Sequence, residues 1–234
     1  MHAALPRVFV GVILSSMKRA DTHRHHGAHH HDHNRDHYGN PKDLKAYLDR
    51  LEGPARKEWQ KPDVVVRSLR LKPGQTVAEI GSGPGYFTLR LAKAVGKRGR
   101  VFAAEVEPKM IAILRDRLEQ KKVTNVTPVL ASQHDSHLPA GLADVVFIVN
   151  TFHHFPNGSA YLRALEACLM PDGRLVNIDF REGDLPVGPP ADHKMSRADF
   201  LKLAKAVGFT LAAEHTFLPY QYFVELRCRP LKAR

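Results

Sequence analysis

The chain has 234 residues, of which 43% are hydrophobic and 25% are charged, with 16 Gly and 16 Pro. These proportions are those of ordinary globular proteins, and they exclude a collagen, a wholly disordered chain and a small disulfide-stapled protein. Two cysteines, Cys168 and Cys228, provide no zinc-type spacing and no disulfide framework.

The chain is basic, with a formal net charge of +11. Residues 1–40 hold five of the 35 Lys and Arg residues and three of the 24 Asp and Glu residues, so residues 41–234 carry a charge of +9. Such a charge favours anionic ligands or a polyanion surface, and it equally serves solubility. No basic block with interleaved aromatic residues occurs, so nucleic acid is not an expected partner.

Residues 1–40 have a composition of their own. Eight of the 15 histidines lie between His23 and His37, and this tract has almost no apolar residue, so a disordered, His-rich extension is predicted. Weak binding of a transition metal by these imidazoles is the functional interpretation, and a tail without a metal role is the favoured one. No structured metal site is indicated elsewhere.

No segment is long enough to span a membrane. The longest apolar run, residues 8–14, falls far short of the roughly 20 residues that a transmembrane helix needs. Arg7 before this run and two serines after it faintly resemble a signal peptide, and Met17 is an alternative start. Cytoplasmic localisation is therefore predicted, with export to the periplasm as the alternative.

Residues 41–72 are predicted to form a helical cap on a domain that covers residues 41–234. Apolar residues recur at helical spacing from Leu44 to Leu51, and a Gly-Pro pair ends that helix. Pro62 suits the first turn of a second helix.

The next part of the chain alternates between strand and helix. Short apolar strands are predicted over residues 76–80, 100–105, 126–130, 143–150 and 174–179. The helices between them cover residues 86–95, 108–120 and 160–169. Continuous apolar strands separated by helices indicate a parallel sheet that is covered on both faces.

The end of the chain follows a different pattern. Ser196 is a predicted N-cap for a helix over residues 197–207, and Gly208 ends that helix. Strands over residues 210–217 and 221–227 follow, and the linker between them is too short for a parallel crossover. The predicted fold class is therefore α/β, a doubly wound and mostly parallel sheet with an antiparallel hairpin at one edge.

The motif Val-Ala-Glu-Ile-Gly-Ser-Gly-Pro-Gly-Tyr-Phe, residues 77–87, carries the clearest chemical signal. A strand runs into a turn whose glycines let the backbone approach a ligand closely. The dinucleotide-binding fingerprint has its third glycine one residue later than Gly85, and Tyr86 would crowd a pyrophosphate. Glu79, just before the turn, suits a cationic or amino-bearing ligand better than a phosphate.

Glu105 ends the second predicted strand at the carboxyl edge of the sheet. A carboxylate at this place can accept hydrogen bonds from two ribose hydroxyls, as in other adenosine-binding sheets. Glu107 is assigned to the start of the following helix.

With these features, the sequence resembles the class I S-adenosylmethionine-dependent methyltransferases over residues 60–228. Within that superfamily it is similar to small-molecule enzymes of the ubiquinone and menaquinone methyltransferase type. Three further elements resemble a bacterial group of such proteins: Gln60-Lys61-Pro62, His153-His154-Phe155 and the Leu-Pro-Tyr-Gln-Tyr-Phe of residues 218–223. The resemblance implies S-adenosylmethionine as cofactor, a small-molecule methyl acceptor and a seven-stranded sheet whose last strand is antiparallel.

The resemblance also implies a set of cofactor-binding residues. Asp135 would address the adenine amino group, although His134 also fits the family's position, and Asn150 would lie near the sulfonium. The remaining cofactor-binding residues that it implies are Glu79, Gly81, Ser82, Gly83, Gly85, Glu105 and Val106.

Residues for catalysis follow the fourth strand. His153 and His154 are candidates to take a proton from the acceptor, and packing in a turn is the alternative. Other residues that could line the acceptor pocket, or simply pack in the core, are Trp59, His193, Tyr220 and Tyr222.

Three other functions compete with methyl transfer to a small molecule. The +9 charge of residues 41–234 would also suit an RNA or protein methyltransferase. A non-catalytic protein that binds the cofactor or handles metal is the second alternative, and a nicotinamide-dependent dehydrogenase is disfavoured by the glycine spacing. No metal is expected in the methyl transfer itself.

Overall fold

The computed structural model describes residues 44–228. All of them belong to one of the two units into which the chain divides, His33–Arg234. The predictions for the His-rich tract, for a signal peptide and hence for localisation fall outside the described residues. Within residues 44–228, no helix has the length and apolar character needed to cross a bilayer.

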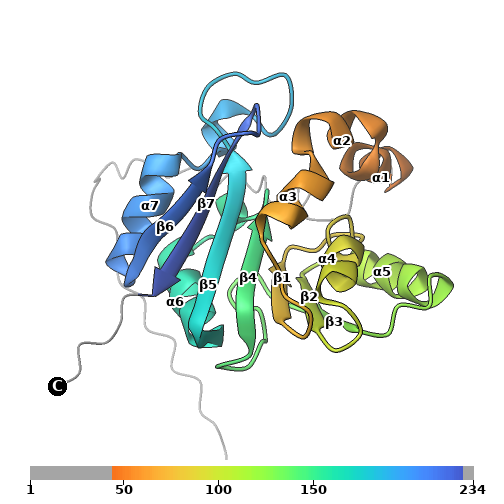
Figure 1. The fold of residues 1–234 in the computed structure, drawn as a ribbon. Helices are drawn as coiled ribbons and strands as arrows, with labels where there is room; N and C mark the ends of the chain where they lie inside the picture. Colours follow the sequence, from red (N-terminus) through yellow and green to blue (C-terminus); the bar gives the residue numbers. More distant parts are fainter. Residues whose placement is uncertain (1–43, 229–234) are drawn as a thin grey trace, which may run out of the picture. The chain divides into compact units, whose positions relative to one another are not determined.

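A seven-stranded sheet with the order β3-β2-β1-β4-β5-β7-β6 forms the centre of the described part of the chain (Figure 1). The five strands β1 to β5 run parallel, and β7 is antiparallel to both of its neighbours, β5 and β6. The predicted doubly wound sheet with an antiparallel edge hairpin is thus confirmed. The strands are Thr76–Ile80 (β1), Arg100–Glu105 (β2), Val126–Leu130 (β3), Ala143–Val149 (β4), Leu169–Phe180 (β5), Phe209–His215 (β6) and Gln221–Cys228 (β7).

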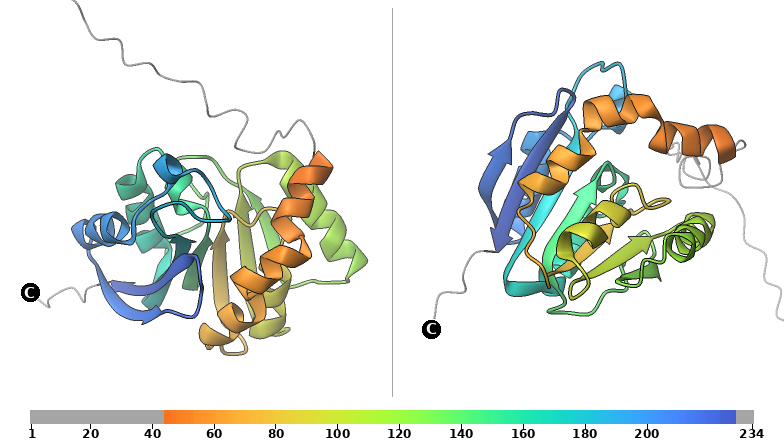
Figure 2. Two further views of the ribbon diagram at one scale, coloured as in Figure 1. Left: turned by 90° about the horizontal axis from the view of Figure 1, so that it is seen from above. Right: turned by 45° about the vertical axis from the view of Figure 1, so that its right-hand side comes forward.

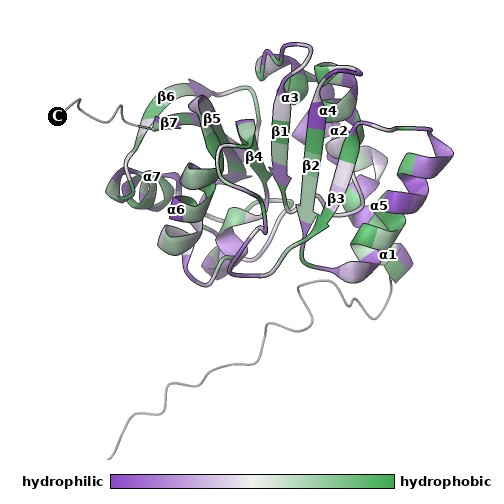
Figure 3. Ribbon diagram, turned by 90° about the horizontal axis from the view of Figure 1, so that it is seen from below, coloured by the Kyte–Doolittle hydropathy of each residue, from purple (hydrophilic) through white to green (hydrophobic). Residues whose placement is uncertain are grey.

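Helices cover both faces of this sheet (Figure 2). One face packs against apolar residues of α3 and α4, and the other against those of α6 and α7. Helix α5 packs along β2 and β3 through Leu114 and Leu118, and Figure 3 shows hydrophobic and hydrophilic stretches alternating along it. The helices are Leu44–Glu52 (α1), Pro54–Gln60 (α2), Pro62–Ser68 (α3), Thr88–Val95 (α4), Pro108–Gln120 (α5), Gly158–Cys168 (α6) and Arg197–Ala206 (α7).

The structure departs from the prediction in two elements. The cap contains a third helix, α2, where only two helices were predicted, because its seven residues offer too short a periodic pattern to detect. Strand β5 begins at Leu169 rather than at residue 174. The Pro-Asp-Gly segment that was expected to end a helix instead forms an irregularity in the pairing of β4 with β5.

Helix α7 starts at the predicted N-cap. The Ser196 hydroxyl accepts a hydrogen bond of 2.9 Å from the Asp199 amide and donates one of 2.8 Å to the Asp199 carboxylate. The Ser196→Ala substitution is therefore expected to lower the free energy of unfolding by about 1 kcal/mol, measured by urea denaturation. The control is Ser159→Ala in the first turn of α6, whose side chain has no hydrogen bond among the described residues; an equal loss in both variants would contradict the assignment of the cap.

Candidate active site

A cavity of about 420 Å³ lies at the carboxyl ends of β1, β2 and β4. Its volume falls within the roughly 300–1,000 Å³ that is typical of small-ligand sites. Helices α1 and α2 and the loop of residues 181–196 provide the other walls, and Figure 1 shows them at the end of the sheet where β5 finishes. In sheets of this kind, ligands commonly bind at the carboxyl ends of neighbouring parallel strands, beside a crossover connection.

The glycine-rich turn forms the floor of the cavity through Gly81, Ser82 and Gly83. Gly81 has a φ angle of +74° and Gly83 one of +53°, both in the left-handed region that favours glycine. A Cβ atom on Gly81 would lie 2.3 Å from the Thr151 hydroxyl oxygen, so no side chain fits there. The bare backbone of this turn is therefore free to approach a ligand.

Gly85 packs against a neighbouring helix. It does not line the cavity, and a Cβ atom at this position would lie 2.7 Å from a methyl carbon of Leu114 on α5. With a φ angle of +99°, Gly85 allows α5 to approach the turn. The structure therefore shows a packing contact at Gly85, and the cofactor contact there stays a prediction.

Glu105 joins the end of β2 to the glycine-rich turn. Its carboxylate accepts hydrogen bonds from the amides of Gly83 (2.7 Å), Val106 (2.8 Å) and Glu107 (3.0 Å). Burial raises the pKa of this carboxyl, and the three amides act in the opposite direction. Glu105 and Val106 both line the cavity, while Glu107 caps α5 through the Lys109 amide.

Glu79 is the second buried carboxyl group of the cavity. The hydroxyl of Thr88 donates a hydrogen bond of 2.6 Å to it. Burial raises the pKa of Glu79 to about 8, since this single bond and the more distant Arg56 do not offset the loss of water. A cation placed beside Glu79 would favour its ionised form.

The cap contributes arginines to the opposite wall. Arg50 and Arg56 line the cavity, and the Arg56 guanidinium carbon lies 4.1 Å from the centroid of the Tyr86 ring. Burial lowers the pKa of Arg56 to about 10, which still leaves the group charged at neutral pH. The cavity therefore has carboxylates on its sheet side and guanidinium groups on its cap side, an arrangement that suits a ligand with both charges.

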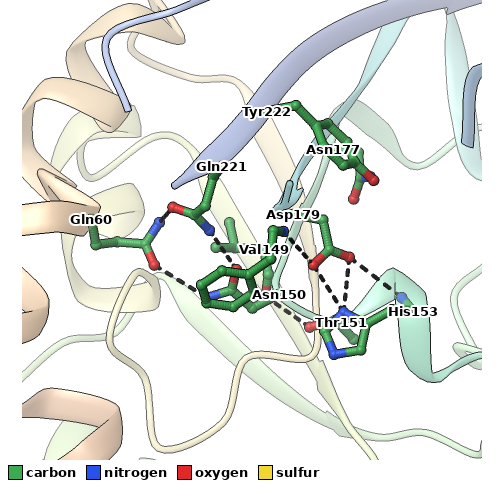
Figure 4. A network of polar contacts seen from close by, with 10 residues as sticks. Gln60, Val149, Asn150, Thr151, His153, Asn177, Asp179, Gln221 and Tyr222 are labelled. Carbon is green, nitrogen blue, oxygen red and sulfur yellow. Dashed lines mark hydrogen bonds and ion pairs between the residues drawn. The ribbon is translucent and has the colours of Figure 1, made fainter. Parts of the chain in front are cut away.

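Three carboxamides form a closed ring that joins the cap to the sheet (Figure 4). The Gln60 amide donates to Gln221 (2.6 Å), Gln221 donates to Asn150, and Asn150 donates back to Gln60 (3.2 Å). Gln60 and Gln221 are fully buried, and they come from α2 and from the start of β7. Asn150 lines the cavity with a φ angle of +53°, but both polar atoms of its side chain are engaged in this ring.

His153 and Asp179 form a buried pair at the edge of the cavity. The Nδ1 atom of His153 lies 2.9 and 3.0 Å from the two carboxylate oxygens of Asp179, which ends the predicted fifth strand. Side-chain exposure is 4% for His153 and 1% for Asp179, so bulk water does not compete for this contact. The His154 ring packs against the His153 ring with centroids 4.0 Å apart, and both histidines line the cavity.

Aromatic side chains complete the wall beside the histidines. Trp59 of α2 and Phe180 at the end of β5 lie with ring centroids 5.7 Å apart. The rings of Phe155 and Tyr161 stack at 3.9 Å with an angle of 11°. All four line the cavity, which gives it flat apolar surfaces next to His153.

The loop after β3 holds the two residues considered for the adenine contact, which stays a prediction. Neither Asp135 nor His134 lines the cavity, and the Asp135 carboxylate accepts the His137 amide at 2.8 Å. The Ser132 hydroxyl accepts the amides of His134 (3.2 Å) and Asp135 (2.9 Å), which closes a tight turn. From this turn it is Gln133 that reaches the cavity.

The other residues considered for the acceptor pocket fall into two groups. Trp59 lines the cavity, whereas Tyr220 and His193 do not, although Gly188 and Pro189 of the same loop as His193 do. Tyr222 is a core residue, and its hydroxyl receives a hydrogen bond of 3.2 Å from Asn177.

Several cavity residues were not singled out from the sequence. Asp179 carried a detectable signal, since it is an acid at the carboxyl end of the strand that follows the two histidines. The others depend on contacts between distant segments, and they are Arg50, Arg56, Gln133, Thr151 and Tyr161.

Comparison with known proteins agrees with this geometry. Residues 77–173 match the model of a family described as a methyltransferase domain. The chain is 27% identical over 158 residues to a ubiquinone/menaquinone biosynthesis C-methyltransferase UbiE of Vibrio vulnificus, covering 67% of this chain and 59% of that protein. It is 31% identical over 140 residues to the UbiE of Ectopseudomonas mendocina, covering 59% of this chain and 54% of that protein. The chain thus spans just over half the length of these curated relatives.

A solved structure shows the same arrangement. The crystal structure of a SAM-dependent methyltransferase from Aquifex aeolicus superposes with a TM-score of 0.73 and 25% sequence identity. The match covers 77% of this chain and 96% of the Aquifex protein. The chain thus contains a segment that matches a methyltransferase domain, and it has the fold of a SAM-dependent methyltransferase.

Proposed function

We propose that the protein transfers a methyl group from S-adenosylmethionine to a small-molecule acceptor. The observation that carries the proposal is the pair of buried carboxyl groups, Glu79 and Glu105, beside a glycine-rich turn at the strand ends. Neither forms an ion pair within the described residues, so both suit a cationic, hydroxyl-bearing ligand. When bound, the cofactor supplies a methyl group that is already activated on a positively charged sulfur.

The residues of the cavity fit the parts of this cofactor. Glu105 uses three of its roughly four acceptor positions on main-chain amides, which leaves capacity for a ribose hydroxyl. Glu79 would lie beside the positive charge of the cofactor. Arg56 and Arg50 would suit the carboxylate of its methionine moiety. We assign the adenine contact to Gln133, since this side chain lines the cavity.

The protein's contribution is then mainly alignment. Holding the acceptor in line with the methyl group can supply about 7–11 kcal/mol of the barrier in ideal cases. The cap and the aromatic side chains Trp59, Phe155 and Phe180 enclose the place beside the cofactor, which excludes water and suits an acceptor of small size. The names of the UbiE relatives, which refer to quinone biosynthesis, support a small molecule as the acceptor class.

Isothermal titration tests the cofactor assignment. Both S-adenosylmethionine and its demethylated product are expected to bind, and Glu105→Ala is expected to weaken both at least tenfold by removing the acceptor for ribose hydroxyls and the tie to Gly83. The control is Glu214→Ala, which removes an ion pair to Arg197 at the protein surface. An absence of binding to the unaltered protein would contradict the proposal.

The acceptor class is tested with radiolabelled cofactor and a cell extract of the source organism. Label is expected in the small-molecule fraction, and it should resist treatment of the extract with nuclease and with protease. Label that is lost on nuclease or protease treatment would show RNA or protein as the acceptor instead.

A further inference from the structure

We infer that His153 and Asp179 act together to remove a proton from the methyl acceptor, and that the acceptor therefore carries a weakly acidic hydroxyl on an aromatic ring. The inference rests on the proposed methyl transfer. It adds His153 as a catalytic residue, Asp179 as a positioning residue and an aromatic hydroxyl as the acceptor group. It is carried by the contacts of Asp179, by the position of His153 and by the aromatic wall beside it.

Asp179 is surrounded by hydrogen-bond donors. Besides the imidazole, its carboxylate accepts the Phe180 amide at 2.8 Å and the His153 amide at 3.4 Å. Both are N–H donors, so every contact made by this buried group is one that a carboxylate accepts. A protonated carboxyl would have to turn a hydroxyl toward one of these donors.

This arrangement determines the tautomer of His153. Because Asp179 accepts, the Nδ1 atom of His153 must carry the hydrogen, and in the neutral ring Nε2 is then the nitrogen with the lone pair. Figure 4 shows Nε2 on the side of the ring that points away from Asp179. A histidine held in this way is an acceptor for protons and a poor donor, as in catalytic pairs of histidine with a carboxylate.

The position of His153 links this proton acceptor to the reaction. His153 lines the same cavity as Gly81 and Asn150, which lie at the strand ends assigned to the cofactor. Asp179 reaches it from β5, the neighbour of β4 in the sheet, and the 3₁₀ turn Phe152–His154 presents the imidazole just past the end of β4. The pair therefore lies next to the place that an acceptor must occupy.

The proton balance favours a hydroxyl as the acceptor group over a thiolate or an amine. A thiolate or an unprotonated amine can attack a methyl sulfonium without prior loss of a proton, so neither requires this pair. A hydroxyl does require the pair, because it must lose its proton. The oxygen–methyl bond forms as the carbon–sulfur bond breaks, and the electrons of the broken bond pass to sulfur. The hydroxyl proton moves to Nε2 of His153. The resulting imidazolium is stabilised by Asp179 and later releases the proton to water.

The walls indicate that this hydroxyl is attached to an aromatic ring. Trp59, Phe155 and Phe180 line the same cavity as His153, and aromatic walls of this kind suit a planar acceptor. A phenol also gives up its proton to a neutral imidazole more readily than an aliphatic alcohol does, because its pKa, about 10, lies closer to that of an imidazole.

Two measurements test the inference together. The first is ¹⁵N NMR of the His153 ring in the protein bound to the demethylated cofactor, which reports the tautomer without any acceptor. The second is methyl transfer from S-adenosylmethionine to substituted phenols that range from fully protonated to fully ionised at the assay pH. The variants are Asp179→Asn and His153→Gln, and the matched control is Asp172→Asn, an exposed residue of the same strand.

The Nδ1-protonated tautomer is expected in the unaltered protein, and the other tautomer in Asp179→Asn. Asp179→Asn should lower kcat by about 10²–10⁴ for weakly acidic phenols but less than tenfold for phenols that are already ionised, with cofactor affinity unchanged. His153→Gln should show the same selective loss. If the pair were only structural, both variants would lower kcat by the same factor for every phenol.

Three results would overturn the inference: an Nε2-protonated ring in the unaltered protein, an equal loss for all phenols in both variants, or no methylation of any phenol by a protein that binds the cofactor. In the last case the proposed cofactor function would stand and only the acceptor class would fall. Failure to bind the cofactor at all would instead refute the proposed function itself.

Discussion

The Gly81→Ala substitution is expected to weaken binding of the demethylated cofactor by about ten- to a hundredfold, measured by isothermal titration. At a φ angle of +74° an alanine is strained by about 1–3 kcal/mol, and its Cβ atom would also lie 2.3 Å from the Thr151 hydroxyl oxygen. Relief of this clash must move either the floor of the cavity or the segment that leads from β4 to His153. Both of these line the proposed cofactor site.

Two further variants separate clash from strain. Gly141→Ala has a comparable φ angle of +62° but nothing within 4 Å of the added Cβ atom, and it lies outside the cavity. It should lose stability by about 1–3 kcal/mol while its affinity stays unchanged. Replacing Thr151 with glycine in the Gly81→Ala background removes the clashing atoms and should recover part of the affinity. Normal binding by Gly81→Ala would show that the turn is not part of the site.

The affinity for S-adenosylmethionine is expected to rise roughly tenfold between pH 7 and pH 9 through the ionisation of Glu79. In the free protein, burial raises the pKa of Glu79 to about 8, so at pH 7 most molecules carry a neutral carboxyl group. If the carboxylate is the form that faces the cation, the apparent affinity is reduced by the fraction that is still protonated. Below pH 8, binding should therefore release a proton from Glu79.

Glu79→Gln isolates this contribution, because the cofactor's own amino group titrates equally in both proteins. The variant is expected to lose the additional pH dependence and the additional proton release, measured by titration calorimetry in two buffers of different ionisation heat. Identical pH profiles for the variant and the unaltered protein would contradict the role given to Glu79.

The same raised pKa predicts how the stability of the free protein depends on pH. Glu79 is protonated more readily in the folded chain than in the unfolded chain, so its contribution favours folding below the unfolded value of about 4.5. That contribution is lost as the pH rises toward 8. Glu79→Gln should therefore flatten the decline in the free energy of unfolding over this range.

The sequence was sufficient for the parts of the fold that depend on local pattern. The apolar strands, the glycine that ends α4 and the Ser196 cap are short-range features, and the antiparallel hairpin follows from the length of one linker. The floor of the cavity follows equally from local features, because a glycine-rich turn after a buried strand exposes its backbone wherever that strand lies.

The remainder of the site depends on contacts between distant segments. The ring of Gln60, Asn150 and Gln221 joins residues up to 161 positions apart, and no periodicity reports such a contact. Asp179 is adjacent to His153 only because β5 pairs with β4. Local sequence also did not indicate that the Ser132 turn brings Gln133, rather than Asp135, to the cavity wall.

A crystal structure with the demethylated cofactor tests the central claim most directly. The account predicts an adenosyl group across the ends of β1, β2 and β4, with a ribose hydroxyl on Glu105 and its sulfur toward the wall that holds His153. Density for the cofactor at another place on the protein, or a cavity that stays filled by the protein's own side chains at saturating cofactor, would contradict it.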